Sequence, residues 1–387
     1  MTRSSRPPPP TPAPPRAAAT FRLFRLHDVG DTYIVGLVRV MIGLLLFWNA
    51  LRAGYELRTG GYFGHAFHMP MLPEALVPSA LVYIVIVAAQ IVCAALVTVG
   101  HRARPALFFT SIAGVYVLLC DRLQFHHNRY ALFCFAFLLA FAPCDRAFVI
   151  TAPPESEESH ARIGPLWAQR LAQLQLCIVY LSSGGSKLLD PDWRDGLVIG
   201  DRFARYGHQA LERGVPRAVV EIMSRADVTS ALAKIAIATE LSLAIALWLR
   251  KTRVLALWWA VMFHLTIEVT SRVEIFTWLS LAILCLFATP DYKARKLFYD
   301  PTRARGRILA KLVAGLDWLA RFDVRPWEPD ALKKGHSLVI VGRDGSRATG
   351  VRAVAMVARC VPLLFPFWAP IALAASFTKG GEASARG

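Results

Sequence analysis

Long apolar runs separated by short polar segments fill the chain between residues 31 and 297. A helix of about twenty apolar residues crosses the roughly 30 Å hydrocarbon core of a bilayer, and most of these runs come close to that length. The pattern therefore predicts an all-α polytopic membrane protein. About eight transmembrane helices are expected, at residues 33–51, 77–99, 105–120, 130–143, 166–188, 230–249, 254–270 and 275–289.

The polar segments outside these runs predict surface structure. Residues 1–20 are proline-rich and have no apolar core, which indicates a disordered tail and not a cleaved signal peptide. A short amphipathic segment at residues 21–27 completes a surface region that reaches residue 30. Broken helical periodicity at 197–213 and 217–225 predicts interfacial helices in the longest connection.

Residues 298–387 form a separate C-terminal extension. A basic linker leads to a short strand-like run at 337–350 and then to an apolar stretch at 353–377. Three prolines, Pro362, Pro366 and Pro370, interrupt that stretch and disfavour a regular ninth span. The expectation is a small, irregular, membrane-associated extension.

The distribution of charged residues predicts how the chain is oriented in the membrane. The chain has a formal net charge of +17 and 55% apolar residues, and its mean hydropathy is +0.42. Lys and Arg gather in the short segments between apolar runs, which argues against nucleic acid as a partner and matches the positive-inside rule. The tail, the turns at 101–104 and 250–253, and the run after Pro290 are basic and fall on one side. We expect a bacterial inner (cytoplasmic) membrane protein with a cytoplasmic N-terminus and an outward-facing site.

Candidate chemistry centres on residues 180–193, where an apolar helix meets two glycines, a lysine and two aspartates. Lys187 stands near a membrane face, where it either snorkels to water or turns inward as a functional group. Asp190 and Asp192 are interpreted as helix caps.

Further ionisable residues lie in the next two runs. Glu240 is near mid-depth, where a carboxylate costs about 2.5 to 3.5 kcal/mol unless it is paired or protonated. His264 and Glu268 are four residues apart and share a helical face. Either a structural hydrogen bond or a functional cavity shared with Lys187 explains them.

The histidines of the outer loops are candidates for a metal site. His126 and His127 precede Asn128, and His65 and His68 lie in an earlier loop. No acidic residue stands at ligand spacing, and adjacent histidines diverge, so a polar vestibule lining is favoured and no metal is expected. The seven cysteines form no CxxC pair, so neither a disulfide framework nor a zinc site is inferred.

Several motifs occur in a fixed order. They are Arg39 and Gly43; His126, His127, Asn128 and Tyr130; Gln175, Ile178, Val179, Tyr180, Gly184, Lys187 and Leu188; Glu240, Leu241 and Ser242; and Phe263 and His264. Over about residues 31–297 the chain resembles the vitamin K-dependent gamma-carboxylase family. The bacterial form of this family is called the horizontally transferred transmembrane (HTTM) domain.

The resemblance implies a mechanism and a cofactor. Lys187 would be the base that deprotonates reduced vitamin K or a related quinol, which starts an oxygenation to the epoxide and creates a strong base for carboxylating peptide glutamate. His127 and Asn128 would be catalytic neighbours. The quinol cavity would be formed by Tyr180, Gly184, Gly185, Glu240, His264 and Glu268, with the glycines allowing close approach to the backbone.

Departures from the animal enzymes shape the functional expectation. Lys187 and Trp193 are separated by one residue more than in the animal enzymes. The histidine of the animal enzymes aligns with Asn128, and their propeptide-binding domain has no counterpart here. The chain end is faintly similar to the close of the thioredoxin-like DCC domain without its Cys pair, so no redox function is expected there.

Two functional classes follow. One is a carboxylase/epoxidase-like lyase that acts on a reduced quinone, with carboxylation of a protein or peptide substrate as a coupled step. The other is a non-catalytic membrane protein, a transporter or an assembly factor, that reuses the bundle. The expected partners are a lipid-soluble quinol, a protein or peptide substrate and membrane lipid, and no nucleic acid.

Overall fold

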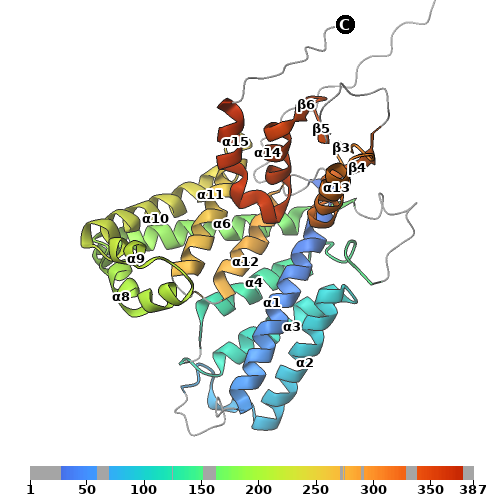
Figure 1. Ribbon diagram of the computed structural model, residues 1–387. Coiled ribbons are helices and arrows are strands. Elements are labelled where there is room, and N and C mark those ends of the chain that lie inside the picture. The colour runs from blue at the N-terminus through green and yellow to red at the C-terminus, as the bar shows by residue number, and fades with distance from the viewer. Residues whose placement is uncertain are drawn as a thin grey trace, which may run out of the picture.

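All eight apolar runs are helical in the structure, a computed structural model that describes residues 28–58, 69–123, 125–150, 163–270, 273, 275–288, 292–327 and 338–377. The helices form the bundle in Figure 1. They are α1 (Tyr33–Arg58), α2 (Ala80–Val99), α3 (Ala103–Leu119), α4 (His127–Ala140), α6 (Trp167–Leu189), α10 (Ala226–Ala246), α11 (Arg253–Thr270) and α12 (Ile275–Leu284), which the 3-10 turn η3 (Cys285–Phe287) extends.

Four helices in the described residues are long and apolar enough to cross a membrane: Tyr33–Glu56, Ala80–Val99, Ala226–Ala246 and Arg253–Thr270. α4 has 14 residues, about 21 Å at the usual rise, which is short of a bilayer core. α6 has 23 residues but carries Arg170, Lys187 and three glutamines. In Figure 1, α6 and α10 also run at a clear slant to α1 and α2. Eight spans therefore stay a prediction.

The outward face of α2 is apolar. Leu81 is 71% exposed and Val92 is 60% exposed, while Tyr83, Val87 and Ala94 face the bundle. A helix that leaves this much aliphatic surface uncovered fits a hydrocarbon surrounding better than water.

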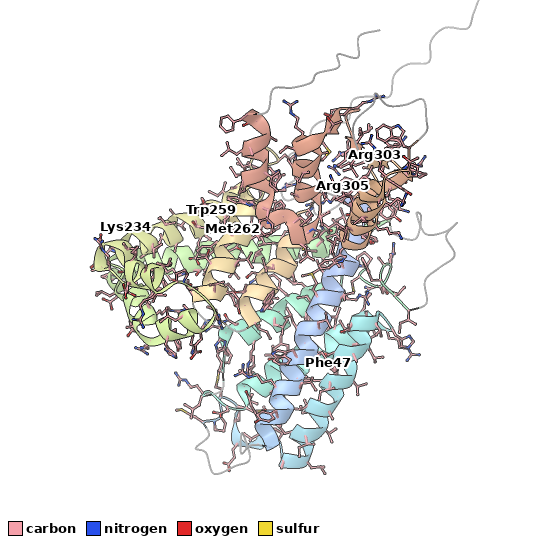
Figure 2. All side chains as sticks on the ribbon, in the orientation of Figure 1. Phe47, Lys234, Trp259, Met262, Arg303 and Arg305 are labelled. Atoms are coloured by element: carbon pink, nitrogen blue, oxygen red, sulfur yellow. The ribbon has the colours of Figure 1, made fainter. Side chains whose placement is uncertain are left out.

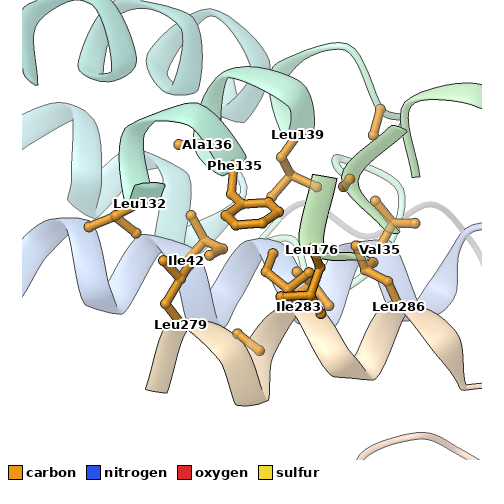
Figure 3. Close-up of a cluster of buried hydrophobic side chains, with 14 of the residues drawn as sticks. Val35, Ile42, Leu132, Phe135, Ala136, Leu139, Leu176, Leu279, Ile283 and Leu286 are labelled. Atoms are coloured by element: carbon orange, nitrogen blue, oxygen red, sulfur yellow. The ribbon is translucent and has the colours of Figure 1, made fainter. Parts of the chain in front are cut away.

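The main core lies between α1, α4, α6 and α12. Val35, Val38, Ile42 and Leu46 recur on one face of α1 at spacings of three and four and are at most 1% exposed. Figure 3 shows this face meeting the other helices. The labelled partners are Leu132, Phe135, Ala136 and Leu139 of α4, Leu176 of α6, and Leu279, Ile283 and Leu286 of α12 and η3.

Arg39 of α1 is fully buried and has a structural role. Its guanidinium donates to the carbonyls of Val97 at 2.9 Å, Ala147 at 3.0 Å and Phe148 at 2.6 Å. These carbonyls lie at the end of α2 and in the turn after α4, where the regular helical hydrogen bonds end. Arg39 thus joins α1 to the end of α2 and to the turn after α4 through their backbone carbonyls.

Consecutive helices alternate in direction, and we call the end where α1, α3, α6 and α11 begin the basic end. There, β1 (Val29–Asp31) pairs antiparallel with β2 (Ile163–Pro165). Tyr33 packs on Phe148 and Tyr292, with ring centroids 4.8 and 5.5 Å apart. Arg104 donates to Ala140 O at the close of α4.

The opposite end, called the far end, carries the predicted connection helices. α7 (Pro191–Arg194), α8 (Leu197–Glu212) and α9 (Arg217–Met223) fold there, to the left in Figure 1. A 3-10 turn, η2 (Glu74–Leu76), precedes α2. Helices were expected at 197–213 and 217–225, so their existence is confirmed, while their position relative to a membrane stays a prediction.

The C-terminal part corrects an expectation. Instead of an irregular extension, a four-stranded sheet in the order β4-β3-β5-β6 packs with helices around its own core of Leu297, Phe322, Ile340 and Val357. β3 pairs parallel with β4, and β5 pairs antiparallel with β3 and β6. The elements are β3 (Arg295–Tyr299), α13 (Ala304–Leu316), β4 (Phe322–Pro326), β5 (Leu338–Val341), β6 (Arg347–Thr349), α14 (Gly350–Cys360), η4 (Pro362–Phe367) and α15 (Trp368–Phe377).

This C-terminal unit also moves the expected boundary. A division between residues 297 and 298 would cut through β3, so the unit begins before Arg295. The apolar stretch is broken into α14, η4 and α15, as the prolines predict. Trp258 of α11 donates to Pro366 O at 2.8 Å and ties the unit to the bundle. In Figure 2, Arg303 and Arg305 lie on this unit, across the molecule from Lys234.

Replacing Arg39 tests its structural role. Arg39→Leu leaves several buried carbonyls without a donor, and we expect it to lower the free energy of unfolding by about 3 kcal/mol. Thermal unfolding in detergent micelles measures the change. The control is Arg205→Leu, which removes a pair with Asp201 whose side chains are 68% and 55% exposed, worth about 0.5 kcal/mol. Equal losses in the two variants would contradict the role.

Candidate functional site

Lys187 turns into the bundle and pairs with Glu240. Its Nζ lies 2.6 and 2.7 Å from the two carboxylate oxygens of Glu240 and 2.7 Å from Ser183 Oγ. The side chains of Lys187 and Glu240 are only 17% and 7% exposed. Glu240 was expected to need a partner at mid-depth, and the structure supplies Lys187. A lysine held this way is not snorkelling.

Every N–H of the Lys187 ammonium has an acceptor. An ammonium has three donors, and two Glu240 oxygens and Ser183 Oγ take them. Ser183 Oγ also donates to Glu240 Oε1 at 3.1 Å, so the three side chains form a closed network. Trp193 covers the network, with its ring centroid 4.9 Å from Lys187 Nζ.

The turn after α6 positions Trp193. Asp190 caps α7 by accepting from Asp192 N at 2.9 Å. The predicted helix cap at Asp190 is therefore confirmed. The turn reverses the chain direction and places the Trp193 indole over the end of α6.

Tyr180 and His264 form a second buried pair. Tyr180 lies two helical turns before Lys187, and its hydroxyl is 2.8 Å from His264 Nε2. Tyr180 is 1% exposed and His264 is 0% exposed. Among the described residues, His264 Nδ1 is buried without a hydrogen-bond partner. The ring of Phe276 packs edge-on against His264 at 5.5 Å.

The two glycines of α6 differ in role. A Cβ at Gly184 would lie 3.0 Å from Leu241 Cγ and 3.1 Å from Glu240 Cβ, so α10 occupies that side. A Cβ at Gly185 would meet no atom within 4 Å. Gly184 therefore allows close packing of α6 on α10, while its predicted role in substrate approach stays a prediction. Gly185 keeps open space.

Glu268 opens on a cavity of about 680 Å³ at the far end. Glu268 Oε2 is buried and has no hydrogen-bond partner among the described residues. Lys187 is not part of the lining. The cavity is lined by Leu45, Trp48, Asn49, Arg52, Arg129, Tyr206, Gln209, Glu268, Ile275 and Trp278.

His127 and Asn128 are the first two residues of α4, and they differ in burial. Asn128 is 5% exposed, and its amide reaches Val273 O at 3.5 Å, before α12. His127 is exposed and stacks on His126 with ring centroids 5.1 Å apart. No described contact joins either residue to Lys187. His65 and His68 lie outside the described residues, so the metal alternative is not decided.

Sequence reasoning missed Ser183, Trp193 and Arg129. Ser183 stands four residues before Lys187, a spacing that places both on one helical face and could have revealed it. Trp193 is brought in by the turn after α6, which no periodicity encodes, and Arg129 lies in the first turn of α4.

Comparison with known families decides the classification. The sequence model of the HTTM domain matches residues 28–292, well over half of the chain. The chain belongs to the HTTM-domain family. No solved structure matches it. Together with the four candidate spans, this establishes an HTTM-domain membrane protein.

A pair of glycine variants tests the packing beside this site. Gly184→Leu must displace α10 and disturb the Lys187–Glu240 pair, so we expect a loss of about 2 kcal/mol in the free energy of unfolding. Gly185→Leu, the control, adds the same side chain to open space and gains up to about 1 kcal/mol in helix propensity. Thermal unfolding of the purified variants measures both, and equal stability of the two would contradict the close approach.

Proposed function

We propose that this HTTM-domain protein is a membrane enzyme that deprotonates and oxygenates a reduced quinone, as vitamin K-dependent gamma-carboxylases do. The observation that carries the proposal is the buried Lys187–Glu240 pair. A charge pair withdrawn from water costs several kcal/mol in desolvation, and ionisable groups kept inside a membrane bundle mark functional sites by default.

Glu240 gives Lys187 a way to become a base. A protonated amine whose three N–H groups are engaged has no lone pair to offer. Transfer of one proton from Nζ to a Glu240 oxygen along the 2.6 Å contact produces a neutral amine and a neutral carboxylic acid. The amine can then accept a phenolic proton, while Ser183 and Trp193 hold it in place.

The far-end cavity fits an aromatic substrate. Its volume lies within the range of small-molecule sites, and Trp48, Trp278 and Tyr206 supply aromatic walls. Glu268 Oε2 is an acceptor for a phenolic O–H. His264, one turn away on α11, and Tyr180 connect this wall to α6.

The chemistry comes from the quinol. Reduced vitamin K or a related quinol supplies the acidic phenol and the electrons, and the net conversion consumes the quinol and O2 and yields the quinone epoxide and water. Carboxylation of a glutamate in a protein or peptide partner is the coupled step in the proposal. The basic end faces the cytoplasm, and the far end with its cavity faces outward.

A second candidate function is favoured because all three N–H donors of Lys187 already have acceptors. A lysine that donates to three acceptors also serves as a plain structural tie between α6 and α10. In that case the protein is a non-catalytic membrane protein that uses the same bundle for transport or assembly.

An epoxide assay separates the two candidates. Purified protein is incubated with reduced vitamin K and oxygen, and the epoxide is quantified by chromatography and mass spectrometry. We expect wild type to form epoxide and Lys187→Ala to form it at least about 100-fold more slowly, the usual scale for loss of a general base. Lys187→Arg keeps the positive charge, but a guanidinium does not act as a base, so it should be equally slow.

Controls distinguish chemistry from folding. Lys187→Arg should unfold at a temperature close to wild type because the pair with Glu240 is retained. Lys234→Ala removes an exposed lysine of α10 and should leave the rate unchanged. Absence of epoxide from wild type, or full activity of Lys187→Arg, would establish the structural tie instead.

A further inference from the structure

A second cavity, of about 610 Å³, lies at the basic end of the bundle. It is formed where α6 and α11 begin and where α10 and η3 end, so it sits at the boundary of the apolar helices. Three arginines face one aspartate in its wall. The lining residues are Asp28, Val29, Gly30, Leu166, Gln169, Arg170, Gln173, Trp248, Arg250, Arg253, Leu286, Phe287 and Ala288.

Two of the arginines are held in place by the fold. Arg253 donates to the carbonyls of Leu247 at 2.8 Å and Trp248 at 2.9 Å, which cap the end of α10. Arg170 donates to Gln173 Oε1 at 2.9 Å and lies 3.7 Å from Asp28. Guanidinium groups fixed before a ligand arrives lose little side-chain entropy on binding.

Arg250 is different because it is exposed at the rim. It makes no hydrogen bond or ion pair with the described residues. The wall between the arginines is apolar, with Leu166, Leu286 and Phe287 each at most 6% exposed. An arginine rim over an apolar wall suits a ligand that is anionic at one end and apolar at the other.

We propose that the basic-end cavity binds the phosphate of an anionic phospholipid. Arginine forks match phosphate oxygens with paired hydrogen bonds, and basic pockets between membrane helices bind anionic head groups. The location favours a lipid over a free phosphate, because the cavity lies at the ends of α10 and α11, two helices long and apolar enough to cross a membrane, and Trp248, a typical interfacial side chain, forms part of its wall.

The site is separate from the proposed enzyme chemistry. Lys187 and Glu268 lie toward the far end, and none of the residues assigned to quinol binding lines the basic-end cavity. A bound lipid would brace the starts of α6 and α11 against the end of α10, which are the helices that carry Lys187, His264 and Glu240.

Lipid titration of the delipidated protein tests the site. The protein is held in non-ionic micelles at moderate salt, which screens general surface charge. Phosphatidylglycerol, phosphatidylcholine or inorganic phosphate is then added, and the thermal unfolding midpoint is followed. We expect phosphatidylglycerol to raise the midpoint in a saturable way, and the other two to have little effect.

Two neighbouring variants supply the matched comparison. Arg250→Gln and Lys251→Gln each remove one positive charge from the same exposed turn, but only Arg250 lines the cavity. Arg250→Gln should weaken the apparent affinity for phosphatidylglycerol about tenfold, the scale of one charge-assisted hydrogen bond. Lys251→Gln should change it less than about twofold.

Three results would overturn the proposal. Equal weakening by both variants would mean attraction to a charged surface and not a site. An equal response to phosphatidylcholine would remove the role of the anionic head group. A full shift with inorganic phosphate alone would assign the arginines to a free phosphate. The assay contains no quinol, so its outcome is independent of epoxide formation.

Discussion

Burial of the Lys187 ammonium is the constraint on which the far half of the bundle depends. A charge removed from water must be matched by an opposite charge and by hydrogen bonds. Glu240 provides the charge, and Ser183 completes the bonds. The match works only if α6 and α10 come close, and Gly184 makes that approach possible. The turn capped by Asp190 then returns Trp193 over the pair.

Arg39, which is fully buried, and Lys187, whose side chain is 17% exposed, are cations of the bundle that are compensated differently. Arg39 is surrounded by backbone carbonyls, which are fixed dipoles that neither take nor release a proton. Lys187 faces a carboxylate, which can exchange a proton with it. Arg39 is therefore a permanent tie, whereas the proposed function depends on cancelling the charge of Lys187 in place.

The apolar runs predicted all eight helices, because burial and lipid exposure both demand continuous apolar sequence. The predicted number of eight membrane-crossing helices stays a prediction, since α4 has only 14 residues and α6 carries two charged side chains. The sequence suggested a cavity shared by Lys187 and Glu240, but their direct contact depends on the close approach at Gly184, which only the packing reveals. The strand-like run at 337–350 predicted β5 and β6, but β3 and β4 were missed because their pairing is parallel and joins segments that are distant in the sequence.

The order of the strands in the C-terminal sheet also determines when β3 can find its partner strands during protein synthesis. β3 lies inside the sheet and is the first of its strands to leave the ribosome, immediately after α12. Its partners follow over about fifty residues, roughly several seconds of translation. During that interval Leu297, which is 0% exposed in the folded protein, has no complete sheet to be buried in.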